Sequence, residues 1–332
     1  MKSFSSLTRL GQVRRLRALA LAALRQYDLK VARLSLLTYH FNAIFRIDTP
    51  GKERFVLRIN IPRIRTLGNI RSEALWLAAL SRDTDLTVPT PVLNRSGERV
   101  TTVAASGIPE PRHCVVFEWV PGQDLRHRMT TGNYRKLGAL TSRLHDHAEA
   151  WNPPPGFDVP THTGIFIFDT PELFWETTQA PEVITPDRAA LFRETARRVQ
   201  AGLDAIYAKA GKPHILHADL HQGNVRIMRG GDLSVLDFDD CLAGHFVQDI
   251  GITFYYMQGH PEYEALRSAY RDGYENRRPW PETGERQIET IIAGRELLLF
   301  QFLFFSDNPR YRDAVPRYIA RAEARSRGYL DG

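Results

Sequence analysis

The chain has 332 residues, of which 43% are hydrophobic and 25% are charged. These values are ordinary for a folded globular protein and argue against a disordered chain. The length exceeds the usual size of a single hydrophobic core, so we expect two lobes. The two cysteines, Cys114 and Cys241, are too few for a disulfide framework or a paired CxxC zinc site, and they favour a reducing, cytoplasmic compartment.

Three features resemble membrane or nucleic-acid signals, and each has a simpler interpretation. Residues 14–24 place arginines before an apolar run, as an export signal does, but the run is short and its Ala-x-Ala lies inside it, which favours a helix. The apolar run Leu297–Phe305 is far below the roughly 20 residues of a membrane helix, so we expect a buried helix. The net charge of +6 comes with no nucleic-acid-binding motif. We therefore expect neither a membrane nor a nucleic-acid partner, and a monomer or a homodimer.

The first part of the chain is expected to be rich in strands. Residues 7–27 have helical spacing, and residues 41–62 form two strand-like runs around a Thr-Pro-Gly-Lys turn, the pattern of a hairpin. Residues 70–83 are amphipathic and predict a second helix. Two short strands around a polar turn at residues 94–98 follow, and a strand over residues 113–122 ends at a Pro-Gly stop.

Beyond that stop the sequence is mainly helical. Helices are expected over residues 134–151 and 187–210 and over most of residues 246–332. A small β-rich lobe therefore precedes a larger helical lobe, and the predicted fold class is α+β. We place the first lobe at residues 1–118, a hinge at 119–122 and the second lobe at 123–332.

The densest group of polar side chains is "HADLHQGN", residues 217–224. The following "VRIMRGGDLSVLDFDD" predicts two short strands around an Arg-Gly-Gly-Asp turn. This hairpin would bring Asp237 and Asp239 back beside the polar groups of the first motif. Oxygen ligands of this kind suit Mg²⁺ and substrate phosphates, and a carboxylate that the metal does not use can accept a proton from an attacking hydroxyl. The pattern indicates phosphoryl transfer.

The two motifs resemble the kinase catalytic loop H-x-D-L-x-x-x-N and the metal-binding D-F-G, here Asp237-Phe238-Asp239. The chain is similar to the aminoglycoside phosphotransferase and choline kinase family, and within it to the homoserine kinase type II and bacterial stress-response kinase branches. The resemblance covers nearly the whole chain. It implies a two-lobed, protein-kinase-like fold and ATP-dependent transfer of the γ-phosphoryl group to a hydroxyl.

The resemblance also implies roles for the residues of the two motifs. Asp219 would be the catalytic base. Asn224 and Asp237 would hold Mg²⁺, and Asp239 would be a second acidic group beside the metals. Asp249 would fix the catalytic loop from behind.

By the same resemblance the nucleotide binds in the first lobe. Arg58 of "FVLRI" takes the place of the usual lysine; it keeps the charge, although the two cations are not equivalent. Glu73 on the following helix is expected to pair with Arg58, and Asn42 matches a position that relatives use. The loop over residues 38–47 departs from the kinase pattern because it has no glycine. The linker residues that would face adenine with their backbone groups are Glu118, Trp119 and Val120.

The acceptor is expected to be a small hydroxyl compound. The family shapes its acceptor site with the segments that correspond here to residues 166–176 and 293–298. Arg295 would attract a carboxylate, and nearby acidic residues would attract an amine, so an amino alcohol or a homoserine-like compound is favoured. These acidic residues are Glu172, Glu176 and Asp240.

Other interpretations remain open. The acceptor could be a Ser or Thr of a protein, as in stress-response kinases, or the chain could be an inactive nucleotide-binding module. A metallohydrolase is a third alternative, although the spacing does not reproduce H-x-H-x-D-H. Its ligands would be His214, His217, Asp219 and His221. Arg58 and Glu73 could form a plain surface ion pair. The residues that we expect to be core or surface helix residues, without a ligand role, are His145, His147, Tyr255 and Tyr256.

Overall fold

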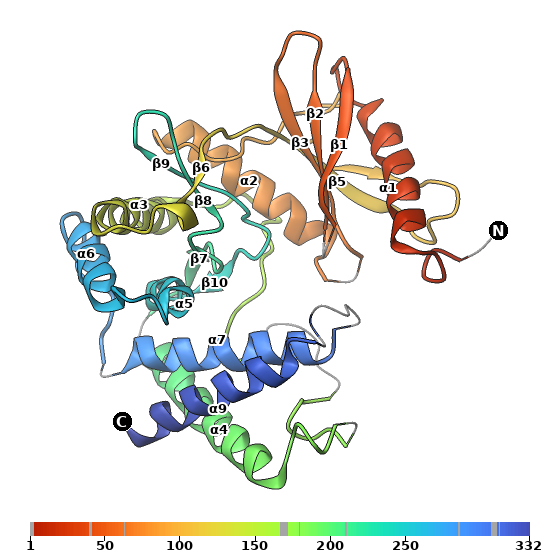
Figure 1. Ribbon diagram of the computed structural model, residues 1–332. Helices are drawn as coiled ribbons and strands as arrows, with labels where there is room; N and C mark the ends of the chain where they lie inside the picture. Colours follow the sequence, from red (N-terminus) through yellow and green to blue (C-terminus); the bar gives the residue numbers. More distant parts are fainter. Residues whose placement is uncertain are drawn as a thin grey trace. The chain divides into compact units, whose positions relative to one another are not determined.

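The computed structural model describes residues 3–39, 42–62, 64–166, 172–178, 180–209, 211–284, 286–306, 311 and 313–332. The chain forms two compact units, whose elements are labelled in Figure 1. Unit 1 contains Met1–Asp124, Trp151–Val159 and Val225–Asp239, and unit 2 contains Leu125–Ala150, Pro160–Asn224 and Asp240–Gly332. Neither unit is one continuous segment. The lobe boundaries at residues 118 and 123 stay a prediction.

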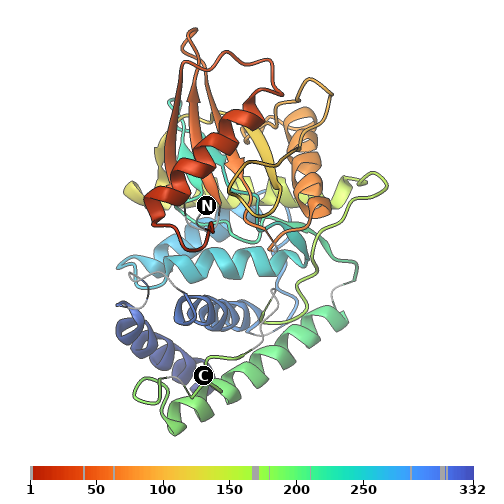
Figure 2. The same cartoon turned by 90° about the vertical axis from the view of Figure 1, so that its right-hand side faces the viewer.

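Unit 1 is built around a five-stranded antiparallel sheet with the spatial order β1-β2-β3-β5-β4. Helix α1 crosses one face of this sheet (Figure 2). Helix α2 begins at a capping box, in which Thr66 accepts a hydrogen bond from the amide of Asn69. The elements are α1 Arg9–Leu24, β1 Arg33–Tyr39, β2 Ala43–Asp48, β3 Arg54–Ile59, α2 Leu67–Asp83, β4 Thr101–Val103 and β5 Arg112–Glu118.

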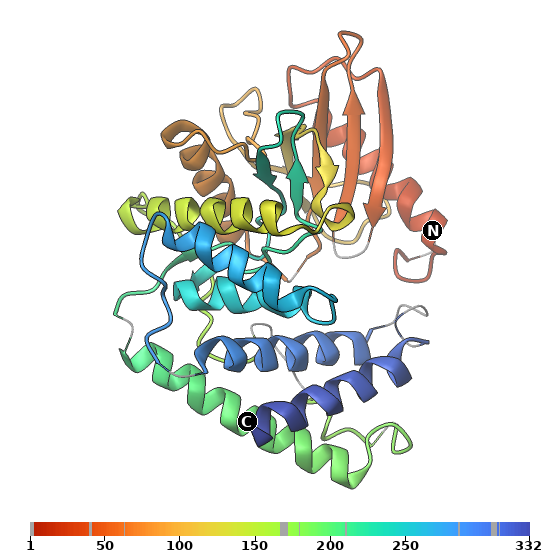
Figure 3. The ribbon, with the colours of Figure 1, turned by 60° about the vertical axis from the view of Figure 1, so that its left-hand side comes forward.

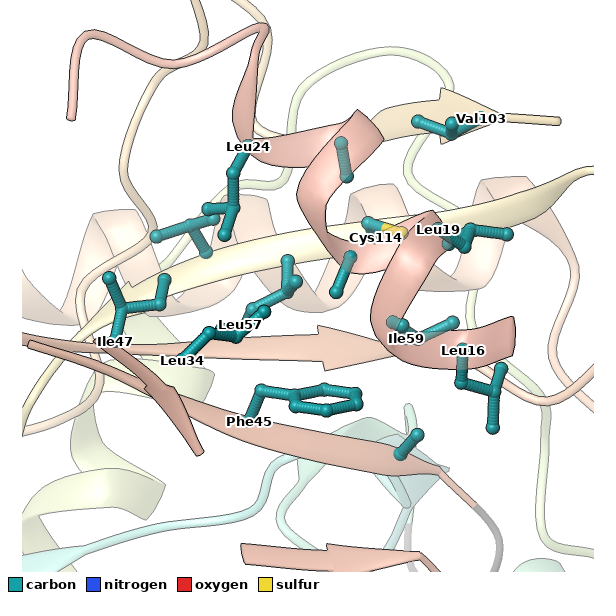
Figure 4. Packing of buried hydrophobic residues seen from close by; sticks show 14 of the residues in the cluster. Leu16, Leu19, Leu24, Leu34, Phe45, Ile47, Leu57, Ile59, Val103 and Cys114 are labelled. Carbon is teal, nitrogen blue, oxygen red and sulfur yellow. The ribbon is translucent and has the colours of Figure 1, made fainter. Parts of the chain in front are cut away.

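Strand β3 connects the core of unit 1 to its pocket. Leu57 and Ile59 are buried in the core with Phe45 and with Leu16 of α1 (Figure 4). Because side chains alternate along a strand, Arg58 points to the other face of the sheet, where it lines a pocket. The core between α1 and the sheet therefore fixes the strand that presents Arg58.

A smaller three-stranded sheet in unit 1 has the order β6-β8-β9. Its strands are β6 Gln123–Asp124, β8 Val225–Ile227 and β9 Leu233–Val235. Strands β8 and β9 pair antiparallel, which confirms the hairpin predicted after "HADLHQGN". The return strand leads directly to Asp237.

Unit 2 is mainly helical. Its short strands β7 His214–Leu216 and β10 Leu242–Gly244 pair antiparallel. In the sequence, β7 precedes the hairpin of β8 and β9, and β10 follows it. Helices α3 and α6 lie side by side, and α4, α7 and α9 pack against one another (Figures 1 and 3). Among the described residues, no helix is long and apolar enough to cross a membrane. The helices are α3 Thr131–Ala150, α4 Pro186–Lys209, α5 Phe246–Met257, α6 Tyr263–Glu275, α7 Gln287–Phe304 and α9 Val315–Asp331, preceded by the 3-10 turn η1 Leu125–His127.

Most predicted elements are confirmed, and the differences concern strands. The helices, the hairpin over residues 41–62 and the strand over residues 113–122 are present, and the predicted buried helix is α7. Of the two strands expected around residues 94–98, only β4 forms; the other is a single bridge at Pro91. Strands β1, β6, β7 and β10 were not predicted.

The glycine-free loop at residues 38–47 is largely not a loop. Strand β1 runs to Tyr39 and β2 starts at Ala43, and these two residues pair across the connection. Residues 40 and 41 lie outside the described residues. Most of the segment without glycine is therefore two paired strands.

Candidate active site

A pocket with a cavity volume of about 410 Å³ opens in unit 1. This size falls within the range of small-molecule sites, and its walls are mainly apolar, as such sites require. Strands β1 to β3 provide Leu37, Ile44 and Val56, and the other side is formed by Leu77 of α2 and Leu236 after β9. The polar groups of the pocket are Thr38, Arg58, Glu73, Glu118, Arg226 and Asp237.

The predicted pairing of Arg58 with Glu73 is present, and both side chains are buried. Nη1 of Arg58 lies 2.8 Å from Oε1 of Glu73, and Nη2 binds Oε2, so the pair is bidentate. Burial alone would lower the pKa of Arg58, but the charges of Glu73 and Asp239 raise it. The guanidinium therefore stays charged. The alternative of a plain surface ion pair is wrong.

Asp239 is held by donors from the five-stranded sheet. Nδ2 of Asn42 lies 2.6 Å from Oδ2 of Asp239, and Nδ2 of Asn60 lies 3.2 Å from Oδ1. Nη1 of Arg58 is 3.5 Å from the same Oδ1. The Oδ1 atom of Asn42 accepts from the amide of Ile61, which fixes the orientation of the Asn42 side chain. These contacts tie the end of the D-F-D motif to β2 and β3.

The first residue of that motif, Asp237, has a positive φ of 60°. This is a strained conformation for a residue other than glycine, and such strain is concentrated at functional sites. The next residue, Phe238, is buried and packs edge-on against Trp76 of α2, with ring centroids 5.3 Å apart. The buried ring anchors the motif, while Asp237 lines the pocket with an exposed side chain.

The linker residues line the same pocket, and two of their amides already have partners. The amide of Glu118 donates to the carbonyl of Thr90 at 2.9 Å, and the amide of Trp119 donates to the carbonyl of Arg54 at 3.2 Å. Both bonds hold the linker against its neighbours. Val120 also lines the pocket and follows these two anchored residues.

In unit 2, Asp249 of α5 holds the catalytic loop from behind. Its side chain is fully buried and accepts hydrogen bonds from the amides of His217 at 3.1 Å and Ala218 at 2.7 Å. Burial raises the pKa of Asp249, but its hydrogen bond with His145 and these amides more than offset that effect and hold the pKa below its usual range. Ala218 has a positive φ of 62°, which this carboxylate supports.

Asp219 is surrounded by donors within unit 2. Its Oδ1 accepts from Nη2 of Arg295 at 2.5 Å and from the hydroxyl of Tyr256 at 3.0 Å. Its Oδ2 accepts from Nδ2 of Asn224 at 3.0 Å. Burial raises the pKa of Asp219, but the charge of Arg295 and the nearby ring of His221 outweigh it and lower the pKa to about 2. The carboxylate is ionised and fixed in orientation.

Arg295 does not present a free charge to an acceptor carboxylate, as the sequence suggested. Its guanidinium is buried and paired with Asp219, and it also donates to the hydroxyl of Tyr256 at 3.0 Å. The charge of Asp240 acts on it too. Of the acidic residues expected near an amine, Glu172 and Glu176 are described, but residues 167–171 of the same segment lie outside the described residues.

The metal ligands implied by the family divide between the two units: Asn224 belongs to unit 2, and Asp237 and Asp239 belong to unit 1. Among the described residues, no group of three or more His, Cys, Asp or Glu side chains has an arrangement suited to a metal ion. Nδ2 of Asn224 donates to Asp219, so its amide oxygen points elsewhere. This oxygen and the carboxylates are hard donors, which fit Mg²⁺ by type.

Asn60 was missed from the sequence, and Tyr256, which was expected to be only a core or surface helix residue, donates a hydrogen bond to Asp219. Asn60 lies two positions after Arg58, and side chains of an extended chain share a face at that spacing. Tyr256 lies seven positions after Asp249, two helical turns along α5, and so shares its face. The two-residue spacing of an extended chain, counted from Arg58, and the seven-residue spacing of two helical turns, counted from Asp249, indicate these two positions.

Comparison with known proteins agrees with this geometry. The model of the phosphotransferase enzyme family matches residues 38–284. A protein of Deinococcus radiodurans, described as uncharacterized, is 28% identical over 288 residues, which cover 84% of this chain and 79% of that protein.

Similar solved structures include a microcompartment-associated aminopropanol kinase, with 29% identity, a TM-score of 0.81 and coverage of 95% of this chain and 98% of that one. An amicoumacin kinase in complex with AMP-PNP and Ca²⁺ has 20% identity, a TM-score of 0.74 and 96% coverage of both chains. A spectinomycin phosphotransferase has 11% identity, a TM-score of 0.65 and coverage of 95% and 98%. The predicted α+β, protein-kinase-like fold is confirmed. The chain belongs to the phosphotransferase enzyme family.

Proposed function

We propose that this phosphotransferase uses ATP and Mg²⁺ to phosphorylate the hydroxyl of a small amino alcohol. The observation that carries the proposal is the ionised, oriented carboxylate of Asp219. Unit 1 supports it with a pocket that combines apolar walls and the buried pair of Arg58 and Glu73. In this reaction unit 1 holds the nucleotide, and Asp219 of unit 2 takes the acceptor's proton.

The nucleotide is assigned to the pocket of unit 1. Adenine would lie between apolar side chains of the sheet and Leu236, and Val120 would offer its amide, since those of Glu118 and Trp119 are already engaged. Arg58, oriented by Glu73, would attract phosphate oxygens. In this assignment residues 1–118 form the nucleotide-binding lobe, 119–122 the hinge and 123–332 the acceptor lobe.

Mg²⁺ would be held by Asn224 and Asp237, with Asp239 as the second acidic group. When bound, the ion neutralises charge that develops on the transferring phosphoryl group. The chain's own part is to orient these donors: the amide of Asn224 is fixed by Asp219, and Asp239 is fixed by Asn42 and Asn60.

An amino alcohol is favoured over a homoserine-like acceptor for two reasons. First, the charge of Arg295 is compensated by Asp219 and influenced by Asp240, so the group leaves no cation for an acceptor carboxylate. These three side chains together carry a net negative charge, which favours a cationic acceptor. Second, the similar structure at 29% identity is described as an aminopropanol kinase.

A screen of ADP release tests this function. Purified protein with Mg²⁺ and ATP is assayed with 1-amino-2-propanol, ethanolamine, choline, homoserine, sugars, aminoglycosides and casein. We expect 1-amino-2-propanol or a related amino alcohol to be turned over faster than homoserine. Phosphate incorporated only into casein would favour a protein kinase instead. Nucleotide binding without ADP release from any mixture would favour the inactive nucleotide-binding module.

A further inference from the structure

The two oxygens of Asp219 are not equivalent. A carboxylate oxygen offers two lone pairs to donors. Oδ1 already accepts from Arg295 and Tyr256, so both of its positions are taken. Among the donors of the described residues, only Asn224 lies at hydrogen-bond distance from Oδ2. The position left for an acceptor hydroxyl is therefore on Oδ2.

The next group facing Oδ2 is His221, whose Nε2 lies 3.5 Å away. This distance exceeds an ordinary N–H···O hydrogen bond of roughly 2.7–3.2 Å. Nδ1 of the same ring accepts from the amide of Gly223 at 2.9 Å, so the proton of the neutral imidazole is on Nε2. The ring nitrogen that carries the proton is thus the one that lies nearest to Oδ2 of Asp219.

Two neighbours hold the His221 ring in this orientation. The ring of Tyr256 packs against it with centroids 4.3 Å apart. Gly223 leaves the necessary space, because a Cβ atom there would lie 2.6 Å from Cε1 of His221. The glycine of "HADLHQGN" therefore allows the His221 ring to lie against the backbone of residue 223. The exposed fraction of the His221 side chain is 19%, so solvent or substrate can reach it.

We propose that His221 is a second catalytic residue, which donates its Nε2–H to the acceptor's hydroxyl oxygen while that hydroxyl donates to Oδ2 of Asp219. The inference rests on the proposed phosphotransferase function and names the group that recognises the reacting hydroxyl. Arg295 and Tyr256 are positioning residues in this arrangement, because they act on the acceptor only through Oδ1 of Asp219.

The chemistry balances without further reactants. The acceptor O–H bond breaks and its proton goes to Oδ2 of Asp219. The acceptor oxygen forms a bond to the γ-phosphorus of ATP, and the bond between that phosphorus and the bridging oxygen breaks, releasing ADP. The His221 N–H stays on the ring throughout and stabilises the negative charge that develops on the acceptor oxygen, as preorganised donors do.

The test compares His221→Leu, which removes the donor, with His221→Gln, whose amide places an N–H near the position of Nε2. The probe is 1-amino-2-propanol, or the fastest acceptor of the screen above. His127→Leu, at an exposed histidine of the same unit, is the matched control. We expect His221→Leu to lower kcat roughly 10²-fold, the usual effect of losing one such donor. We expect His221→Gln to recover at least part of that loss, with the KM for ATP unchanged in both variants.

The outcomes separate the inference from the function on which it rests. Wild-type turnover together with an unimpaired His221→Leu enzyme would overturn the inference and leave the function standing. A loss in His221→Leu that His221→Gln does not relieve, with a lower melting temperature in both, would show a structural role and also overturn it. A wild-type enzyme that releases no ADP with any acceptor would contradict both the proposed function and the inference about His221.

A spectroscopic measurement needs no turnover. In ¹⁵N-histidine-labelled protein, the His221 resonances, assigned with His221→Gln, should report a proton on Nε2 and none on Nδ1. A proton on Nδ1 would contradict the hydrogen bond from the amide of Gly223 and would overturn the inference, whatever the kinetic result.

Discussion

Asp219 and Asp237 carry different parts of the proposed reaction, so their amide variants should fail differently. Asp219→Asn keeps the side-chain shape and removes the charge that accepts the proton, so kcat should fall roughly 10²–10⁴-fold with ATP affinity largely intact. Asp237→Asn removes a metal ligand, so both rate and Mg·ATP affinity should fall.

Steady-state kinetics and calorimetry with Mg·ATP distinguish the two defects. Asp232→Asn, in the exposed turn between β8 and β9, is the matched control and should behave as wild type. Full turnover in Asp219→Asn would place the base elsewhere.

The role of Arg58 must be tested without leaving Glu73 buried and unpaired. Removing one partner of a buried ion pair costs about 3–5 kcal/mol, whereas replacing both partners is often tolerated. We therefore expect Arg58→Met combined with Glu73→Leu to keep the fold but to weaken ATP binding about tenfold or more, since a charged hydrogen bond contributes roughly 1.5–3 kcal/mol.

Calorimetry measures the ATP affinity, and melting without nucleotide checks the fold. Arg54→Met on the same strand, with a side chain that is 55% exposed, is the control. Unchanged ATP affinity in the double variant would mean that Arg58 does not contact the nucleotide.

His162 should make the stability of unit 2 depend on pH. Burial, with the nearby charge of Arg295, lowers its pKa to about 4, whereas an unfolded histidine titrates near 6.5. Between these values the unfolded chain binds a proton that the folded chain excludes, so stability falls as the pH falls from about 6.5 to 4.

The full effect is on the order of 3 kcal/mol, and His162→Gln should remove most of it. Urea unfolding at pH 7 and pH 4.5 would measure the difference, with the exposed His127→Gln as control. An equal loss of stability on acidification in wild type and His162→Gln would contradict the assignment.

At the scale of elements, helices α3 and α6 pack closely because each has a glycine where it meets the backbone of the other. A Cβ atom on Gly138 would lie 1.9 Å from the carbonyl oxygen of Tyr270, and one on Gly273 would lie 1.8 Å from that of Arg135. These neighbours are backbone atoms, so they cannot move aside without shifting a helix.

We therefore expect Gly138→Ala to destabilise the protein by about 1–3 kcal/mol or more, the cost of overpacking a tight contact. Gly132→Ala, in the first turn of the same helix with nothing near its Cβ position, should be neutral or stabilising by up to about 1 kcal/mol. Chemical denaturation of both variants provides the measurement. Equal stabilities would show that the helices do not approach so closely.

The elements that the sequence predicts are those with a long periodic signal or with a recognisable turn beside them. Long amphipathic segments such as α3 and α4 carry several turns of periodic signal, and they were found. Strands β6, β7 and β10 have two or three residues and no turn between neighbouring strands to mark them, and their pairing is set by partners far along the chain. Strands β8 and β9 are equally short, but the Arg-Gly-Gly-Asp turn between them marks both.

The same division holds for the site. Asp219, Asn224 and Asp237 stand in motifs and could be located from the sequence, as could Arg58 and Glu73. Tyr256 and Arg295 reach Asp219 from two different helices, and only the folding of unit 2 brings them together. The sequence therefore identified Arg295 but not its partner.

At the scale of the whole molecule, ATP should stabilise the two units unequally. Every described residue that lines the 410 Å³ pocket belongs to unit 1. Ligand binding stabilises the states that contain the site, by about 2.7 kcal/mol at a hundredfold excess over Kd. We expect Mg·ATP to slow amide hydrogen exchange most in β1 to β5 and in α2.

Hydrogen exchange with mass spectrometry, with and without Mg·ATP, tests this expectation. Helices α3 and α6, which contribute no residue to the pocket, serve as the internal reference. Protection confined to these two helices would place the nucleotide elsewhere.

The arginine at position 58 has a consequence for how this enzyme would be detected. Reagents that identify nucleotide sites in whole proteomes often carry ATP linked to an acyl group, which they transfer to a nearby lysine amine. None of the described residues that line the pocket is a lysine. The guanidinium of Arg58 stays protonated beside Glu73 and is no nucleophile for such a group. A chemoproteomic survey based on lysine acylation would therefore pass over this protein even if ATP filled its pocket.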